Sequence, residues 1–151
     1  MNGFNTYIDQ LDYSEVIDFF LRKGKKCLFK RKDFFIHQYD ISLYIAYVEK
    51  GAFRYTCINK DGKEIIVGYS FEKEFICDYS SFLKRGSSLV NIQATTAASV
   101  YVISLNDYLE LLASGVKEPN YRHKVAEALF DFVYSRLLEL YCATPEQRYI
   151  E

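Results

Sequence analysis

The side chains that could bind or transform a small molecule are gathered in one stretch, residues 71–94. The stretch begins apolar at Phe75 and Ile76, becomes polar, and returns to an alternating apolar pattern over residues 89–94. Its polar part contains Asp78, Ser80, Ser81, Lys84, Arg85, Ser87 and Ser88. Hydroxyls and backbone N–H groups in a short excursion between two strands are typical of an anion-binding cradle. The alternative is an ordinary solvated loop, because loops are polar by default.

Patterns for catalysis or metal binding are lacking elsewhere. The two histidines, His37 and His123, are isolated, and no nucleophile elbow, P-loop or dinucleotide-binding glycine motif occurs. The cysteines have no close pair of the kind used by zinc or iron–sulfur sites; they are Cys27, Cys57, Cys77 and Cys142. We therefore expect no enzyme, no metal site and no cofactor.

Length and composition favour one compact domain. The chain has 151 residues, including 14 Tyr and 12 Phe, which is enough apolar material for a sizeable core. Its formal net charge of -1 gives no basic footprint for nucleic acid. No apolar run reaches the length of a membrane span, and residues 1–10 lack a signal-peptide pattern, so we expect a cytoplasmic protein.

The elements that must position the polar stretch are mostly strands. Ser14 could cap a short helix over residues 15–22 that Gly24 ends. From Lys25 onward the pattern is rich in β-branched and aromatic residues, and Asp61-Gly62 marks a hairpin turn. The strands are expected near residues 27–29, 34–36, 41–48, 53–58, 64–69, 89–94 and 99–104. Short strands at this spacing predict a sandwich or barrel, here a small jelly roll.

The last third of the chain has helical periodicity. Ser104 is a suitable N-cap for a short helix that Gly115 ends, and Pro119 suits the first turn of a helix to about Cys142. The apolar residues of this long helix spread too widely for one face; they include Val125, Leu129, Phe132, Val133, Leu137, Leu138, Leu140 and Tyr141. A helix that is apolar on two sides needs two partners, unless it is sunk into its own domain.

Several short motifs carry a resemblance to a known family. Beside the polar stretch these are residues 47–51 (YVEKG), 61–64 (DGKE) and 144–149 (TPEQRY). With them, residues 71–94 resemble the phosphate-binding cassette of the cyclic nucleotide-binding domain in Crp/Fnr-type bacterial transcription regulators. The resemblance implies a double-stranded β-helix or jelly-roll barrel with flanking helices, followed by a long dimerisation helix. It divides the chain into residues 1–24 (helical segment), 25–104 (β-barrel effector domain), 105–143 (helical segment) and 144–151 (start of a missing DNA-binding domain).

The cassette departs from the family pattern where the phosphate would bind. Asp78 stands in the place of the family's glutamate, which accepts a hydrogen bond from the ribose. Ser88 and Leu89, which carry no charge, stand in the place of the arginine that neutralises the phosphate. Arg85, three residues upstream of Ser88, could substitute. Burying a phosphate without a paired cation costs several kcal/mol, so we expect cyclic AMP and cyclic GMP to bind weakly or not at all.

The same comparison predicts a cavity between the cassette and the long helix. Its expected lining consists of Phe75, Cys77, Asp78, Tyr79, Ser80, Ser88 and Phe132, with Arg85 nearby. Aromatic walls with a few hydroxyls and one carboxylate favour a small, mostly neutral ligand over a phosphate. The alternative is that Tyr79 and Phe132 themselves fill the space.

The resemblance also implies partners. The long helix would pair with its copy in a second subunit through Val125, Leu129, Phe132 and Arg136. The predicted function is the effector-sensing and dimerisation domain of a Crp/Fnr-like regulator, which reaches DNA only through a helix-turn-helix domain absent from this chain and does not contact membranes. The alternative is a stand-alone barrel that binds a small molecule or a partner protein and has no role on DNA.

Overall fold

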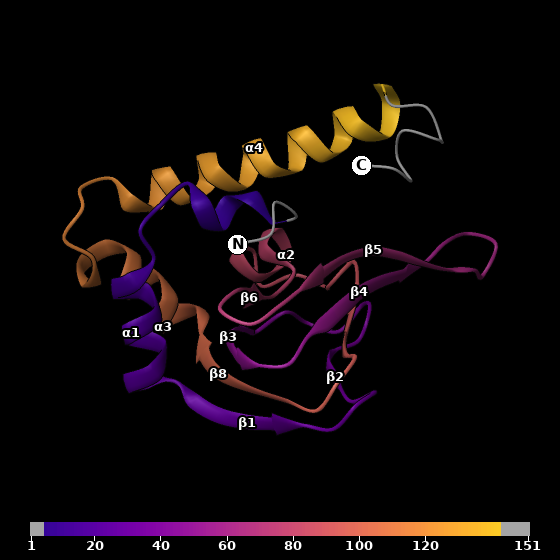
Figure 1. Cartoon of the computed structure of the whole chain (residues 1–151), viewed down its shortest axis with the longest axis horizontal. Coiled ribbons are helices and arrows are strands. Elements are labelled where there is room, and N and C mark those ends of the chain that lie inside the picture. Colours follow the sequence, from indigo (N-terminus) through magenta and orange to yellow (C-terminus); the bar gives the residue numbers. More distant parts are fainter. Residues whose placement is uncertain (1–4, 143–151) are drawn as a thin grey trace.

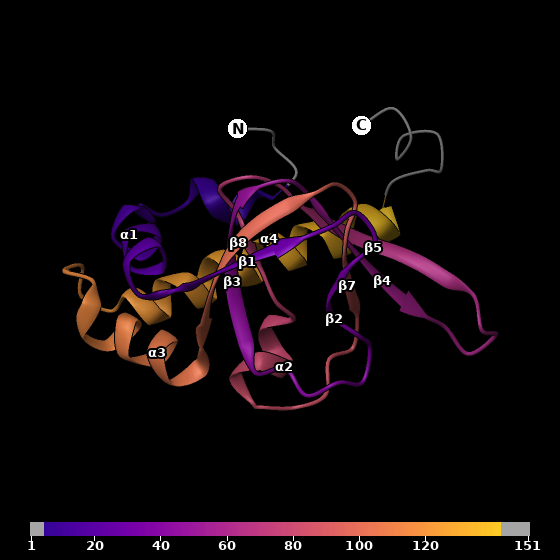
Figure 2. The ribbon, with the colours of Figure 1, turned by 90° about the horizontal axis from the view of Figure 1, so that it is seen from below.

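Strands in two sheets form the body of the molecule (Figures 1 and 2). The computed structural model describes residues 5–142, and within them eight strands make two antiparallel sheets of four. The first sheet has the order β1 (Lys25–Phe29), β8 (Ala98–Ser104), β3 (Tyr44–Lys50), β6 (Phe75–Ile76). The second has the order β2 (Phe34–Ile36), β7 (Asn91–Ala94), β4 (Phe53–Ile58), β5 (Glu64–Ser70). This arrangement confirms the predicted jelly-roll fold.

Both sheets contribute to one apolar core. Alternate residues of a strand point to the same face, so the side chains that face the space between the two sheets recur at every second position. Val48 and Val100 come from the first sheet, Phe53 and Ile92 from the second, and all four are fully buried in one cluster. Complete burial of side chains of this size contributes about 1.5–3 kcal/mol each.

Two glycines make the tight turns that the sequence predicts. Gly62 has φ +76° in the β4–β5 hairpin, where the Asn59 side-chain oxygen accepts from the backbone N–H groups of Asp61 and Lys63. Gly51 has φ +97° between β3 and β4, and a Cβ there would lie 2.6 Å from the Ala98 Cβ. Glycine is required at Gly51 on both grounds, backbone conformation and space.

Two predicted strands begin later than expected, for local reasons. The strand expected from Ile41 begins at Tyr44, because Ile41 makes only an isolated bridge to Ser87. The strand expected from Leu89 begins at Asn91. There the Ser88 hydroxyl donates to the Val90 carbonyl (2.7 Å) and accepts from the Val90 N–H (3.3 Å), which folds residues 88–90 into a turn.

The N-terminal helical segment has a 3-10 turn, η1 (Thr6–Asp9), and a helix, α1 (Ser14–Lys23), that ends before Gly24. The N-cap expected at Ser14 is wrong by one position, because the N-cap residue is Tyr13, and the side chain that accepts at this end of the helix is that of Asp12. Ser14 is already helical, and its backbone N–H and hydroxyl both donate to the Asp12 carboxylate at 2.9 and 2.7 Å. A short side chain that accepts two residues ahead is the same capping chemistry, shifted along the chain.

One short helix lies between the strands of the barrel, and the helices after the barrel follow the predicted order. α2 (Tyr79–Leu83) lies within the cassette, and α3 (Leu105–Glu110) is capped by the Ser104 hydroxyl, which accepts from the Asp107 N–H at 3.2 Å. One wider helical turn, η2 (Leu111–Gly115), continues α3 to the predicted end at Gly115.

The long helix, α4 (Tyr121–Cys142), begins two residues after Pro119. The intervening Asn120 has φ +59°, a left-handed conformation that cannot belong to a right-handed helix. In Figure 1, α4 runs along one side of the barrel, with η1 between them and the β4–β5 hairpin extending at the far end. No described helix is long and apolar enough to cross a membrane. Residues 144–151, predicted to open a DNA-binding domain, lie outside the described residues.

Candidate ligand-binding site

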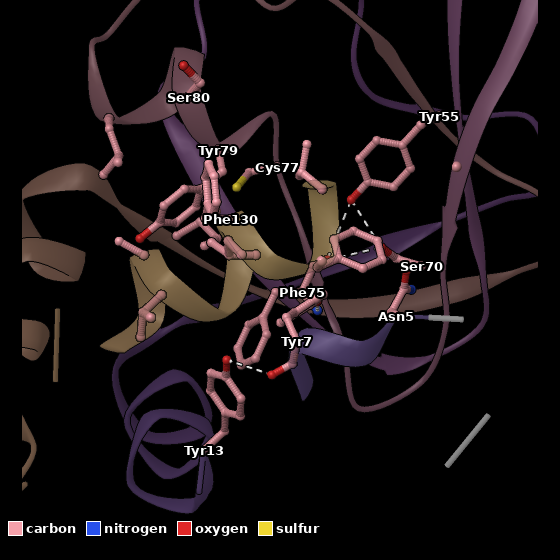
Figure 3. Close-up of a pocket in the computed structure, with 18 of the residues that line it drawn as sticks. Asn5, Tyr7, Tyr13, Tyr55, Ser70, Phe75, Cys77, Tyr79, Ser80 and Phe130 are labelled. Carbon is pink, nitrogen blue, oxygen red and sulfur yellow. Dashed lines mark hydrogen bonds between the residues drawn. The ribbon is translucent and has the colours of Figure 1, made fainter. Parts of the chain in front are cut away.

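A cavity of about 730 Å³ lies where α4, η1, the β4–β5 pair and the cassette meet (Figure 3). Its walls are mostly aromatic and aliphatic, and its polar atoms are mainly phenol hydroxyls. Six of the described lining residues are tyrosines: Tyr7, Tyr13, Tyr55, Tyr69, Tyr79 and Tyr108. Tyr79 and Phe132 stand in the wall, and the space remains open beside them. A cavity of this size and composition suits a small molecule.

The structure brings five of the eight predicted ligand-binding residues to this cavity. They are Phe75, Cys77, Tyr79, Ser80 and Phe132. The other three, Asp78, Arg85 and Ser88, are not among its lining residues. These three are the polar residues on which a phosphate site would have depended, so their contacts decide what the cassette can bind.

Asp78 is engaged within the cassette itself. Its Oδ2 accepts hydrogen bonds from the Ser81 hydroxyl at 2.9 Å and from the backbone N–H of Leu89 at 2.8 Å. The carboxylate therefore joins the start of α2 to the segment that leads into β7. A carboxylate with two close donors is a structural bridge in this position.

Ser88 and Arg85 are also directed to protein partners. Ser88 is fully buried, and its hydroxyl makes both of its bonds with the Val90 backbone. Arg85 is exposed, has φ +52°, and donates from Nη2 to the Asn106 side-chain oxygen of α3 at 2.7 Å. Arg85 thus lies against the outside of α3, and the cassette presents no cation among the described lining residues of the cavity.

The four residues predicted for a dimer seam all line the cavity in the single chain. They are Val125, Leu129, Phe132 and Arg136. Val125 is buried, and the Phe132 ring lies 5.8 Å from the Tyr7 ring, edge to face. This side of α4 is therefore used by the chain's own domain, and the prediction of dimerisation through α4 stays a prediction.

Arg136 is the one charged side chain among the described lining residues. It is half-buried in the second half of α4, with its guanidinium carbon 6.0 Å from the centre of the Phe132 ring. Sequence reasoning assigned Arg136 to the dimer seam because of its spacing on the helix. Its place at the cavity depends on which side of α4 packs against η1, and the local sequence pattern of the helix does not determine that side.

Three buried phenols of the cavity, Tyr13, Tyr79 and Tyr108, make hydrogen bonds, and burial raises the pKa of each. The hydroxyls of Tyr79 and Tyr108 lie 2.8 Å apart, and the Tyr13 hydroxyl donates to the Tyr7 carbonyl at 3.1 Å. Burial raises the pKa of Tyr79 to about 12 and that of Tyr108 well above its usual value. Burial likewise raises the pKa of the Cys77 thiol, so that it is not a thiolate nucleophile at neutral pH.

A buried carboxyl group lies directly behind the cavity wall. Glu74 is 1% exposed, and its Oε1 accepts from the Asn5 side-chain amide at 2.7 Å and from the Phe71 N–H at 2.8 Å. Asn5 also donates to the Tyr69 carbonyl at 2.8 Å. These bonds fasten the start of η1 to the turn between β5 and β6, and so bring Tyr7 to the cavity.

The sequence comparisons agree with this architecture. The family model of the cyclic nucleotide-binding domain matches residues 26–114, more than half of the chain. The chain belongs to the cyclic nucleotide-binding domain family. No protein with a curated function is significantly similar in sequence.

Several solved structures with the same fold are transcription regulators of the Crp/Fnr type. The catabolite activator protein of Thermus thermophilus superposes with a TM-score of 0.72 at 22% identity, covering 89% of this chain and 61% of that one. The c-di-GMP-responsive global regulator CLP of Xanthomonas campestris gives 0.68 at 20% identity, covering 85% and 60%. The sensor domain of the regulator DNR from Pseudomonas aeruginosa gives 0.62 at 14% identity, covering 92% and 87%. The chain therefore spans about three fifths of the first of these regulators.

Proposed function

We propose that this cyclic nucleotide-binding-type domain is the effector-sensing part of a Crp/Fnr-type transcription regulator whose effector is a small, mainly apolar molecule. The observation that carries the proposal is the cavity under α4. It is lined mostly by apolar and aromatic groups, while the cassette residues that would hold a cyclic phosphate are engaged elsewhere.

The case against a cyclic nucleotide is electrostatic. A phosphate moved out of water into this site would need a cation at the cassette, because an unpaired buried charge costs several kcal/mol. Ser88 and Leu89 are uncharged, and Arg85 is exposed and bonded to Asn106. The cassette of this domain therefore keeps the family's backbone shape without its charge.

The proposal includes a homodimer built on α4. One side of the helix carries Phe130, Tyr134, Leu137 and Tyr141, which we call the outer face; their exposed fractions are 66%, 50%, 45% and 82%, and Phe130 at its edge also lines the cavity. The spacing of four, three and four residues is that of a coiled-coil seam. DNA would be bound only by a separate helix-turn-helix domain, the domain itself would perform no catalysis, and such a regulator would act in the cytoplasm.

A thermal-shift screen of small aromatic and alicyclic compounds tests the ligand proposal. A ligand at about one hundred times its Kd adds about 2.7 kcal/mol to the free energy of unfolding, which is readily measured. Ala126 is exposed on α4 and lines the cavity, so Ala126→Trp is expected to close the mouth and abolish the shift. The matched control is Asp131→Trp on the same helix, outside the lining residues. A shift that survives Ala126→Trp would place the ligand elsewhere.

A further inference from the structure

We infer that the ligand of this cavity carries one anionic group, most simply a carboxylate on an aromatic or alicyclic body, and that Arg136 binds that group. The inference rests on the proposed role of the cavity as a ligand site. In this inference the cation that binds the charge of the ligand lies on the long helix, whereas in the family pattern it lies in the cassette.

The position of Arg136 supports this role. It is the single charge among the described lining residues, and it is half-buried at the side of the cavity formed by the second half of α4. A guanidinium has five N–H donors in a planar fork, so it can bind a carboxylate through two of them and keep its contact with Phe132. Partial burial strengthens such a pair, because solvent screens it less than it would at an open surface.

The remaining walls are compatible with an anion. No described lining residue is acidic. Glu74, behind Asn5 and Tyr7, directs Oε1 to Asn5 and Phe71. Burial is the main cause that raises its pKa, which favours the uncharged acid. An anion at Arg136 therefore meets no charged carboxylate among the described lining residues.

The tyrosine pair offers a second point of attachment. When Tyr79 and Tyr108 share a hydrogen bond, one hydroxyl donates and the other keeps its own O–H. That O–H can donate to an oxygen of the ligand. Acceptor oxygens on the ligand therefore match both polar features of the cavity, whereas the apolar walls match its body.

Two fluorescent probes separate the anion from the apolar body. Anilinonaphthalene sulfonate carries one negative charge, and phenylnaphthylamine has the same ring system without it. We expect the sulfonate to bind wild-type protein more tightly than the neutral probe. Arg136→Met should weaken sulfonate binding about tenfold, as loss of a charge-assisted pair implies, and leave the neutral probe within about twofold. Added salt should weaken the binding of the sulfonate probe and leave the binding of the neutral probe unchanged.

Control variants define the outcomes. Arg31→Met makes the same substitution at an exposed loop outside the cavity and should change neither affinity. Ala126→Trp should abolish binding of both probes, which shows that they occupy the cavity. Equal affinities for the two probes, or sulfonate binding unchanged in Arg136→Met, would overturn the inference while leaving the cavity as a ligand site. Failure of both probes to bind wild-type protein would overturn the inference together with the proposed function.

Discussion

At the scale of single residues, the cassette is defined by polar atoms that bond to one another. Asp78 bonds to Ser81 and Leu89, and Ser88 bonds to Val90. Each of these bonds joins two groups of the chain itself. The residue types of an anion cradle are present in the sequence, and their function in the structure is to hold the cassette loop together.

Replacement of Asp78 tests this structural role. Asp78→Ala leaves the Leu89 N–H and the Ser81 hydroxyl without their acceptor, so it should lower the free energy of unfolding by about 1–3 kcal/mol. Asp78→Asn keeps one acceptor oxygen and should cost less. Urea denaturation measures both, with Ser87→Ala, an exposed position of the cassette outside the cavity lining, as control. Unchanged stability in Asp78→Ala, with loss of ligand binding, would instead make Asp78 a ligand contact.

Glu74 predicts a pH dependence of stability with a defined sign. Burial, and to a smaller extent the charge of Asp9, raise its pKa above the ordinary value of 4.5. The folded state therefore holds the proton more tightly than the unfolded state. The stabilisation is complete below pH 4.5 and is lost as the pH rises through the raised pKa.

The measurement compares wild type with Glu74→Gln by urea denaturation between pH 4 and pH 8, about the range in which a raised glutamate titrates. Gln keeps a side-chain oxygen for Asn5 and Phe71 but does not titrate. Relative to Gln, the wild type should lose stability as the pH rises, because other groups titrate alike in both proteins. A difference between the two proteins that is constant with pH would show that the pKa of Glu74 is not raised.

At the scale of elements, α4 has two apolar sides, and one of them packs against the chain's own domain. Tyr121, Val125 and Ala128 are buried against the chain's own domain, and the Tyr121 hydroxyl donates to the Asp12 carbonyl at 2.9 Å. The outer face is largely exposed within the described residues, although Phe130 also lines the cavity, and it includes a stacked pair, Phe130 and Tyr134, with ring centres 5.7 Å apart. The dimer prediction therefore belongs to the outer face.

Charged substitutions on the two sides of α4 should have different effects. Leu137→Glu on the outer face is expected to give folded monomers, because a buried unpaired charge disfavours the dimer. Leu129→Glu on the domain side should lower the stability of the monomer by about 2–5 kcal/mol. Ser135→Glu adds the same charge at an exposed polar position and should change neither property. Sedimentation velocity and urea denaturation measure the two effects. A wild-type monomer at high concentration, or a dimer unaffected by Leu137→Glu, would contradict the prediction.

The elements were predictable to the extent that local chemistry determines them. Asp61-Gly62 specifies a hairpin and Ser104 specifies a helix start, and both are confirmed. The start of β3 was missed because Ile41 makes only an isolated bridge, to Ser87, which is distant in the sequence. The start of β7 was missed because the Ser88 hydroxyl bonds to the Val90 carbonyl and makes a turn there. The start of α4 was missed because Pro119 is typical of a first helical turn, whereas Asn120, which follows it, takes a left-handed conformation and delays the helix.

At the scale of the whole molecule, the cavity is a product of tertiary structure. Tyr7 and Tyr13 come from the N-terminal segment and Tyr55 from β4 (Figure 3), and Tyr108 comes from α3. The cassette half of the site could be predicted, because Phe75, Cys77, Tyr79 and Ser80 are contiguous with the family motif. Phe132 of α4 was also predicted, but Tyr7 and Tyr13 were not, since their place depends on the Asn5–Glu74 contact that docks η1 against the barrel.

Calorimetric titration of the wild-type protein with cyclic AMP and cyclic GMP tests the central claim most directly. The claim is that the cassette keeps the family's shape and has lost its phosphate chemistry. Because the cassette places no cation at the cavity, both nucleotides should bind with a Kd of about 1 mM or weaker. This Kd corresponds to a binding free energy of about -4 kcal/mol, or a less favourable one. Micromolar or tighter binding of either nucleotide would contradict the account and would point to Arg136 of the cavity, or to Arg85 released from Asn106, as the phosphate-binding residue.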